Sequence, residues 1–185
     1  MMKRSDIIIR PAVPEDAPFV GLVVCMALNY DEKHPLYDIF VRLAARTDAQ
    51  YSYCNALVAE ADGKAVGAIV GYDGARLHEL RAPLQAMIVE KTGRPIDIED
   101  ETAAGEFYLD SLAVLPQYRA CGVGRELLQA MRAKAFAAGF SRVGLLVDVD
   151  NPRAEALYSS LGFRRVNPTT FLGHKMWHLQ SVKND

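Results

Sequence analysis

The sequence has little cysteine and no excess of basic charge. Its three cysteines, Cys25, Cys54 and Cys121, are far apart and show no C-x-x-C spacing, so neither a disulfide framework nor a zinc site is expected. Lys and Arg total 21 against 23 Asp and Glu, a formal net charge of -2, which argues against a general nucleic-acid binder. We expect reduced thiols in a cytoplasmic protein that has neither a metal nor a nucleic-acid partner.

Long hydrophobic runs are also missing. No run approaches the roughly 18 apolar residues that a membrane helix needs. The apolar run at residues 7–9, after a basic start, is too short for a signal peptide. Repeats, low-complexity tracts and Gly/Ser linkers are absent from the 185 residues, half of which are hydrophobic. The sequence therefore predicts one globular domain over residues 1–185, with no membrane partner.

What the sequence does contain is an alternation of strand and helix patterns. Apolar runs predict strands near residues 7–9, 56–59, 66–70, 107–114, 143–147 and 171–179, and helical spacing predicts helices after Pro14, after Pro35, over 77–88, after Gly124 and after Asn151. The Asp62-Gly63 pair is typical of a hairpin turn. Pro83 predicts a kink or a restart in its helix, and residues 97–101 are expected to form an exposed acidic connection. This order predicts an α/β fold with a mixed sheet.

A glycine-rich turn lies between the strand at 107–114 and the helix that follows it. Its sequence, Arg-Ala-Cys-Gly-Val-Gly-Arg at residues 119–125, would present unpaired backbone amides at the positive end of a helix dipole, an arrangement that binds phosphate. The turn lacks the Gly-Lys-Ser/Thr ending of a nucleotide P-loop, and no G-x-G-x-x-G follows the first strand. ATP and NAD are therefore poor candidates, while a plain strand–helix turn remains the alternative.

Three stretches together resemble the GNAT superfamily of acyl-CoA-dependent N-acyltransferases. They are Tyr108-Leu109-Asp110-Ser111-Leu112-Ala113-Val114-Leu115-Pro116, the Arg-x-x-Gly-x-Gly element at Arg119, Gly122 and Gly124, and Asn151-Pro152-Arg153-Ala154 leading to Leu157-Tyr158-x-x-Leu161-Gly162-Phe163. The resemblance covers nearly the whole chain. It implies a largely antiparallel central sheet with a splayed parallel strand pair, flanked by helices.

The resemblance also implies acetyl-CoA as the cosubstrate. Backbone amides of the Arg-x-x-Gly-x-Gly loop hold the pyrophosphate in this family, and the loop positions here are Arg119, Ala120, Cys121, Gly122, Val123, Gly124 and Arg125. The exposed strand edge that pairs with the pantetheine arm corresponds to Leu112, Ala113 and Val114. At Ala120 and Cys121 the family often has a glycine and a basic residue, so one charge that would pair with phosphate is lost.

The implied reaction transfers an acetyl group directly to an amine. Tyr158 matches the family tyrosine that donates a proton to the CoA sulfur, although a tyrosine beside Leu157 and Leu161 can also be an ordinary core residue. Asn151 matches a residue that contacts the CoA arm, and it is equally a good helix N-cap. A backbone amide near Leu112 or Ala113 would meet the oxyanion.

The general base is left open between two carboxylates and water. Asp110 and Glu106 lie four residues apart on the strand expected to face the acyl carbon, so by period two they share a face with Tyr108 and Leu112. Otherwise Asp110 is a hydrogen-bond acceptor at a strand end and Glu106 a solvated edge charge. His174 and His178 also share a strand face, but no third metal ligand is apparent.

Residues 74–105 are longer than the connection that the family usually has at this place. We expect this insert to cover the acceptor site, and its carboxylates at Asp97, Glu99, Asp100 and Glu101 to favour a cationic substrate. The acceptor would be a small-molecule amine or a peptide N-terminus, and the protein a monomer or homodimer. A non-catalytic acyl-CoA-binding regulatory module on the same fold is the alternative function.

Overall fold

A computed structural model describes residues 7–183; residues 1–6, which include the basic start, and residues 184–185 lie outside it. One seven-stranded sheet has the strand order β1-β2-β3-β4-β5-β7-β6. The strands are β1 (Ile7–Pro11), β2 (Ala56–Ala61), β3 (Lys64–Asp73), β4 (Phe107–Val114), β5 (Arg142–Asp148), β6 (Arg164–Phe171) and β7 (His174–Val182). All neighbours are antiparallel except β4 and β5, which confirms the mixed, largely antiparallel sheet with one parallel pair.

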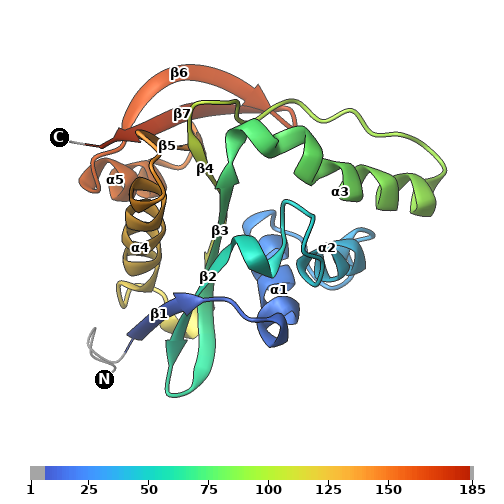
Figure 1. Cartoon of the computed structure of the whole chain (residues 1–185), viewed down its shortest axis with the longest axis horizontal. Coiled ribbons are helices and arrows are strands. Elements are labelled where there is room, and N and C mark those ends of the chain that lie inside the picture. The colour runs from blue at the N-terminus through green and yellow to red at the C-terminus, as the bar shows by residue number, and fades with distance from the viewer. Residues whose placement is uncertain (1–6, 184–185) are drawn as a thin grey trace.

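Helices cover both faces of this sheet. They are α1 (Ala17–Ala27), α2 (Tyr37–Ala44), α3 (Leu77–Thr92), α4 (Val123–Ala137) and α5 (Pro152–Ser160). Figure 1 shows α1, α2 and α3 on one face and α4 and α5 on the other. None of the helices formed by residues 7–183 is long and apolar enough to cross a membrane.

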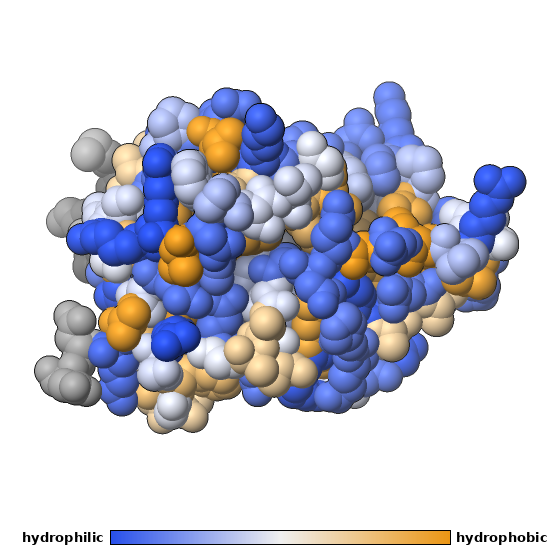
Figure 2. Space-filling model, turned by 90° about the horizontal axis from the view of Figure 1, so that it is seen from above, coloured by the Kyte–Doolittle hydropathy of each residue, from blue (hydrophilic) through white to orange (hydrophobic). Residues whose placement is uncertain are grey.

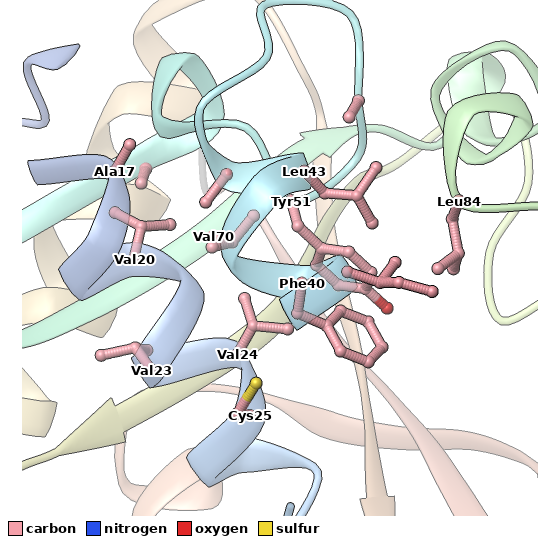
Figure 3. Close-up of a cluster of buried hydrophobic side chains, with 14 of the residues drawn as sticks. Ala17, Val20, Val23, Val24, Cys25, Phe40, Leu43, Tyr51, Val70 and Leu84 are labelled. Atoms are coloured by element: carbon pink, nitrogen blue, oxygen red, sulfur yellow. The ribbon is translucent and has the colours of Figure 1, made fainter. Parts of the chain in front are cut away.

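Each face has its own hydrophobic core. On the α1 side, Val20, Val24, Phe40 and Leu43 pack with residues of β2 and β3, and Figure 3 shows side chains from these elements meeting between the two helices and the sheet. On the α4 side, the core contains Leu127, Leu128, Met131, Val143, Leu145 and Phe163. Both faces of β3, β4 and β5 are therefore covered, as their nearly continuous apolar sequences predict.

Most predicted elements are confirmed, including the last strand near residues 171–179, which corresponds to β7, but strand β6 is not predicted. The chain from 164 to 182 forms a hairpin of two strands, β6 and β7, joined at Leu172 (φ 49°) and Gly173 (φ 78°). Strand β6 lies at the sheet edge and is mostly exposed. Its polar sequence, which includes Pro168, carries no alternating apolar pattern, because an edge strand on the surface does not need one.

A β-bulge in the β3–β4 ladder changes which side chains of β4 share a face. Val70 pairs with Ser111 but its neighbour Gly71 pairs with Leu109, so the register shifts by one residue at Asp110. Tyr108 consequently packs with α3-side residues, whereas Leu112 packs in the α4-side core. The prediction that Leu112 shares a face with Asp110 and Tyr108 is wrong, because a bulge breaks the period of two.

The segment 74–105 contains helix α3 and the residues that lead from the end of this helix towards β4, which form no strand. Helix α3 runs through Pro83 without a restart, and Figure 1 shows the chain passing back from its far end to β4. The acidic stretch 97–101 was expected to be exposed throughout, which is wrong for Glu101, a residue only 7% exposed. Glu101 is buried because it forms an ion pair with Arg81, which is 2% exposed.

The outer surface carries its exposed hydrophobic residues singly on different elements: Ile8, Val13, Val89, Val166, Leu172 and Val182. Figure 2 shows hydrophobic side chains in small separate groups on the face seen from above. Such scattered residues are ordinary on protein surfaces. The expectation of a monomer or homodimer stays a prediction.

Candidate active site

The glycine-rich turn leads directly from β4 into α4. Gly122 is the N-cap residue at φ 88°, and it has no side chain with which to cap the helix. The first intrahelical bond runs from the Glu126 amide to the Gly122 carbonyl, so the amides of Val123, Gly124 and Arg125 precede the hydrogen-bonded part of the helix. These amides and the helix dipole together create a positive potential suited to an anionic group.

Both arginines of the turn are held by hydrogen bonds to the protein. The Arg119 Nε donates to the Val114 carbonyl at 3.0 Å, and the Arg125 Nη2 donates to the Ser160 hydroxyl at 2.7 Å. Each guanidinium has further N–H groups beyond these bonds. Both positive charges are thereby anchored near the start of α4.

Ala120 has a left-handed backbone conformation, with φ at 61°. A non-glycine residue there is strained, and the resemblance noted above marks this position as one where glycine is common. Replacing Ala120 with Gly should raise the free energy of unfolding by about 0.5–1 kcal/mol, because relief of about 1–2 kcal/mol of strain outweighs the extra entropy of an unfolded glycine. Urea denaturation of the two proteins tests this, and a less stable glycine variant would contradict it.

Strands β4 and β5 separate after their first residues. Within the described chain, they pair only at Phe107 with Val143 and at Tyr108 with Gly144. From there to Val114, the side of β4 that faces β5 has no strand partner, while its other side remains paired with β3. The expected splayed parallel pair is thus present, and the open edge includes Leu112, Ala113 and Val114.

Helix α5 follows β5 and carries Asn151 at its N-cap and Tyr158 in its second turn. The Asn151 Oδ1 accepts a hydrogen bond from the Ala154 amide at 3.1 Å, which confirms the predicted N-cap. The partly buried Tyr158 ring packs edge-on against Phe163 at 6.1 Å. Burial raises the pKa of Tyr158, so its phenol stays protonated at neutral pH and is able to donate. In residues 7–183 its hydroxyl has no hydrogen-bond partner within the protein.

Asp110 lies in a polar network on the α3 side of the sheet. Its Oδ2 accepts from the Tyr72 hydroxyl at 2.7 Å and from the Gln50 Nε2 at 3.1 Å, and its Oδ1 accepts from the Ser111 hydroxyl at 2.8 Å. Burial raises the pKa of Asp110, although these hydrogen bonds act in the opposite direction. A partly exposed carboxylate with a raised pKa is suited to accept a proton.

Glu101 joins the same network from the segment 74–105. Its Oε1 lies 3.3 Å from the Tyr72 hydroxyl and 3.3 Å from the Gln50 Nε2, while its Oε2 forms the ion pair with Arg81. Burial, followed by the negative charge of Asp110, raises the pKa of Glu101 to about 7. The carboxylates of Asp110 and Glu101 thus share the same donors.

Glu106, the second predicted base, belongs to a different network. It is 4% exposed, so the interpretation as a solvated edge charge is wrong. Its carboxylate accepts from Thr102 at 2.6 Å and Gln180 at 2.7 Å, and lies 2.9 Å from the His178 Nε2. Burial alone would raise the pKa of Glu106, but the hydrogen bonds from His178, Thr102 and Gln180 lower it below its usual value. Asp110 is therefore better placed than Glu106 to accept a proton.

Glu106 also accounts for a small residue in β5. A Cβ at position 144 would overlap the Glu106 carboxylate, so the space beside it requires Gly144. His174, the other histidine of the pair considered above, lies 3.5 Å from the Asp148 carboxylate. No group of three or more His, Cys, Asp or Glu side chains is placed to hold a metal ion in the part of the chain that the structure describes.

A cavity of about 330 Å³ lies between the segment 74–105 and the strands β5, β7 and β6. Its lining includes three carboxylates, Asp100, Glu101 and Glu106, and two basic side chains, Arg142 and His178. Leu146 contacts both the cavity and the polar network, because it lines the cavity and also packs against the cluster that contains Tyr72 and Tyr108. The cavity therefore adjoins the network that contains Asp110.

Three residues of the network were not identified from the sequence: Gln50, Tyr72 and Arg81. Glu101 was named only as one of the acidic residues of the insert, without its place in this network. Arg81 carries the one clear signal, because it occupies a helical-spacing position among Leu77, Leu80 and Leu84, where an apolar residue is expected. A charge on the apolar face of a helix predicts a buried partner. Nothing in the sequence says that the partner is Glu101.

Comparisons with known proteins agree with this geometry. The model of the acetyltransferase (GNAT) family matches residues 22–163. A solved acetyltransferase structure is 32% identical, with a TM-score of 0.79, over 95% of this chain and 98% of its own. An N-acetyltransferase from Staphylococcus aureus Mu50 superposes with a TM-score of 0.81 at 22% identity, over 94% of this chain and 99% of its own.

A curated relative matches a shorter region. Mycothiol acetyltransferase from Kocuria rhizophila is 42% identical over 66 residues, which is 36% of this chain and 21% of that protein. The chain thus matches about a fifth of the length of this curated relative. The family match, by contrast, spans β4, the glycine-rich turn, α4, β5 and α5. The chain belongs to the GNAT family of acetyltransferases.

Proposed function

We propose that the protein is an N-acetyltransferase that transfers an acetyl group from acetyl-CoA to the primary amine of a small molecule or peptide N-terminus. The observation that carries this proposal is the opening between β4 and β5, which has the uncapped start of α4 at the end of β4 and Tyr158 on the helix that follows β5. An acyl carrier with a diphosphate and an extended arm fits this combination. The solved relatives include a NatC complex bound to a Gag peptide and CoA.

The chain would hold acetyl-CoA mainly through its backbone. The amides of Cys121 to Arg125 would bind the pyrophosphate, with Arg119 and Arg125 adding positive charge. The free edge of β4 at Leu112–Val114 would pair with the pantetheine arm, and Asn151 would contact that arm from the start of α5. Ala120 and Cys121 contribute backbone groups rather than charge.

Three groups of the chain would serve the chemistry. A primary amine with a pKa near 10 is only about 0.1% neutral at pH 7, so Asp110 would accept its proton, directly or through water. A backbone amide near Leu112 or Ala113 would stabilise the negative charge that develops on the thioester oxygen. Tyr158 would protonate the departing thiolate.

We propose that residues 74–105 are an insert within a single domain that covers the acceptor site, and that the adjoining cavity receives the part of the acceptor that extends beyond its reacting amine. Its carboxylates would favour a cationic amine. Changing Asp100 to Asn should raise the KM for a cationic acceptor about three- to fivefold and leave that for acetyl-CoA unchanged, because one partly exposed charge pair is worth about 0.5–1 kcal/mol. Asp97→Asn is the matched control, since Asp97 does not line the cavity. Equal KM values for both variants and wild type would contradict an acceptor site in this cavity.

Thiol release from acetyl-CoA tests the proposed function directly. Dithionitrobenzoate should report amine-dependent release across a panel of small amines and short peptides, and mass spectrometry should find the product heavier by one acetyl group. Tight CoA binding with no turnover on any acceptor would instead favour the non-catalytic acyl-CoA-binding module.

A further inference from the structure

We propose that Tyr72 and Glu101 form a proton relay that carries the proton accepted by Asp110 to the cavity beside residues 100–106. The inference rests on the proposed function, because it concerns the fate of the proton that the acceptor amine loses. It gives the segment 74–105 a part in the chemistry as well as in covering the site.

The distances join the three groups through one hydroxyl. The Tyr72 hydroxyl lies 2.7 Å from the Asp110 Oδ2 and 3.3 Å from the Glu101 Oε1. A phenol has one proton to donate and lone pairs that accept. It can therefore donate to one carboxylate while it accepts from the other, if that one is protonated.

The transfer is balanced without any other reactant. Protonated Asp110 gives its proton to the Tyr72 oxygen while the Tyr72 hydroxyl proton passes to the Glu101 Oε1. Only O–H bonds form and break, and Tyr72 ends as a neutral phenol. Glu101 then releases the proton to water in the cavity that it lines, and Asp110 is ready for the next amine.

The two oxygens of Glu101 face different partners. Oε2 forms the ion pair with Arg81, whereas Oε1 is directed to Tyr72 and Gln50. A carboxylate that served only to neutralise Arg81 would not need the second set of contacts. This geometry leaves Oε1 available to take up a proton while the ion-pair contact stays in place.

Gln50 can adapt to either position of the proton. Its side chain is buried at 2% exposure, and its Nε2 lies 3.1 Å from Asp110 and 3.3 Å from Glu101. Its Oε1 is the one buried side-chain oxygen or nitrogen without a hydrogen-bond partner in residues 7–183. Rotation of this amide by half a turn would present the oxygen to a protonated carboxyl.

The surroundings of Asp110 and Glu101 shift the pKa values of both carboxylates in the same direction. Burial raises the pKa of both, with Glu101 at about 7. The titratable and charged groups around them are Arg81 from α3, Tyr72 from β3, Tyr108 and Glu106 at β4, and Tyr51 from the loop after α2. The two carboxylates therefore bind protons as an interacting pair, and their pKa values are shifted in the same direction.

The pH dependence of kcat/KM tests the relay through two variants with opposite shifts. Glu101→Gln removes a like charge, so the acidic limb should move about one pH unit down. Tyr72→Phe removes a hydrogen bond that lowers the pKa of Asp110, so the limb should move up, and kcat should fall about tenfold or more. Tyr51→Phe, which removes a nearby hydroxyl outside the relay, should leave the limb in place. If the acidic limb of the kcat/KM profile keeps its wild-type position in both Glu101→Gln and Tyr72→Phe, the proposal is overturned.

A second measurement is independent of turnover. Carboxyl-carbon NMR titration of the free protein should show Asp110 and Glu101 titrating as a coupled pair, and Tyr72→Phe should raise the pKa of both. Loss of thiol release with every amine would count against the proposed function alone. Independent titration of the two carboxylates, unaffected by Tyr72→Phe, would overturn the relay even in an active enzyme.

Discussion

Replacing Tyr158 with Phe should lower kcat about 100-fold, because general acid catalysis by a positioned side chain typically contributes about 10²–10⁴ in rate. The Tyr158 ring packs against Phe163, and burial, which raises the pKa of Tyr158, keeps its phenol protonated. The hydroxyl is lost but the ring remains. We therefore expect the KM for acetyl-CoA to change little. Steady-state thiol release at saturating acceptor measures the effect.

The control for this variant is its stability. Since no protein group in residues 7–183 bonds the Tyr158 hydroxyl, the Phe variant should unfold at the same urea concentration as the wild type. A normal kcat in a normally folded variant would show that Tyr158 is a core residue only. A shared loss of stability and activity would point to packing instead of proton donation.

Replacing Arg81 with Met should lower the free energy of unfolding by about 3–5 kcal/mol at pH 8, the usual effect of removing one partner from a buried ion pair. Arg81 also donates to the carbonyls of Ile98 at 2.9 Å and Glu99 at 3.2 Å. The variant therefore also loses the hydrogen bonds that hold the residues between α3 and β4. Glu101 would be left buried without its counter-charge, and its pKa would rise further. The loss should therefore be smaller at pH 6, where Glu101 binds a proton in the folded state.

A double variant separates charge from packing. Arg81→Met combined with Glu101→Leu replaces the ion pair with apolar side chains and should recover most of the lost stability, since such replacements are often close to neutral. Urea denaturation at pH 6 and pH 8 measures all three variants. If Arg81→Met is as stable as the wild type at both values, the ion pair does not hold the segment 74–105 in place.

Local patterns predicted the elements that hold the proposed cosubstrate site. The strand at 107–114, the glycine-rich turn and the N-cap at Asn151 are each encoded by neighbouring residues, so they could be identified before the structure. Strand β6 could not, because this exposed edge strand lacks an apolar period. The bulge at Asp110 was also missed, since it is a property of pairing with β3 rather than of β4 alone.

The polar network around Asp110 could not be predicted either, because it is formed by residues that are far apart along the chain. Gln50 lies 22 residues before Tyr72 and 60 before Asp110, and Arg81 lies 20 before Glu101. Burial of these groups depends on how α3 and the residues between α3 and β4 pack against the sheet, which no short motif describes. Sequence thus indicated a carboxylate at 110, while its partners and its altered pKa come from tertiary structure.

A crystal structure with acetyl-CoA tests the central proposal most directly. We expect the diphosphate on the amides at the start of α4, the pantetheine arm along the open edge of β4, and the sulfur within hydrogen-bonding reach of the Tyr158 hydroxyl. Density for the cosubstrate at any other place, with the turn at 119–125 empty, would contradict it.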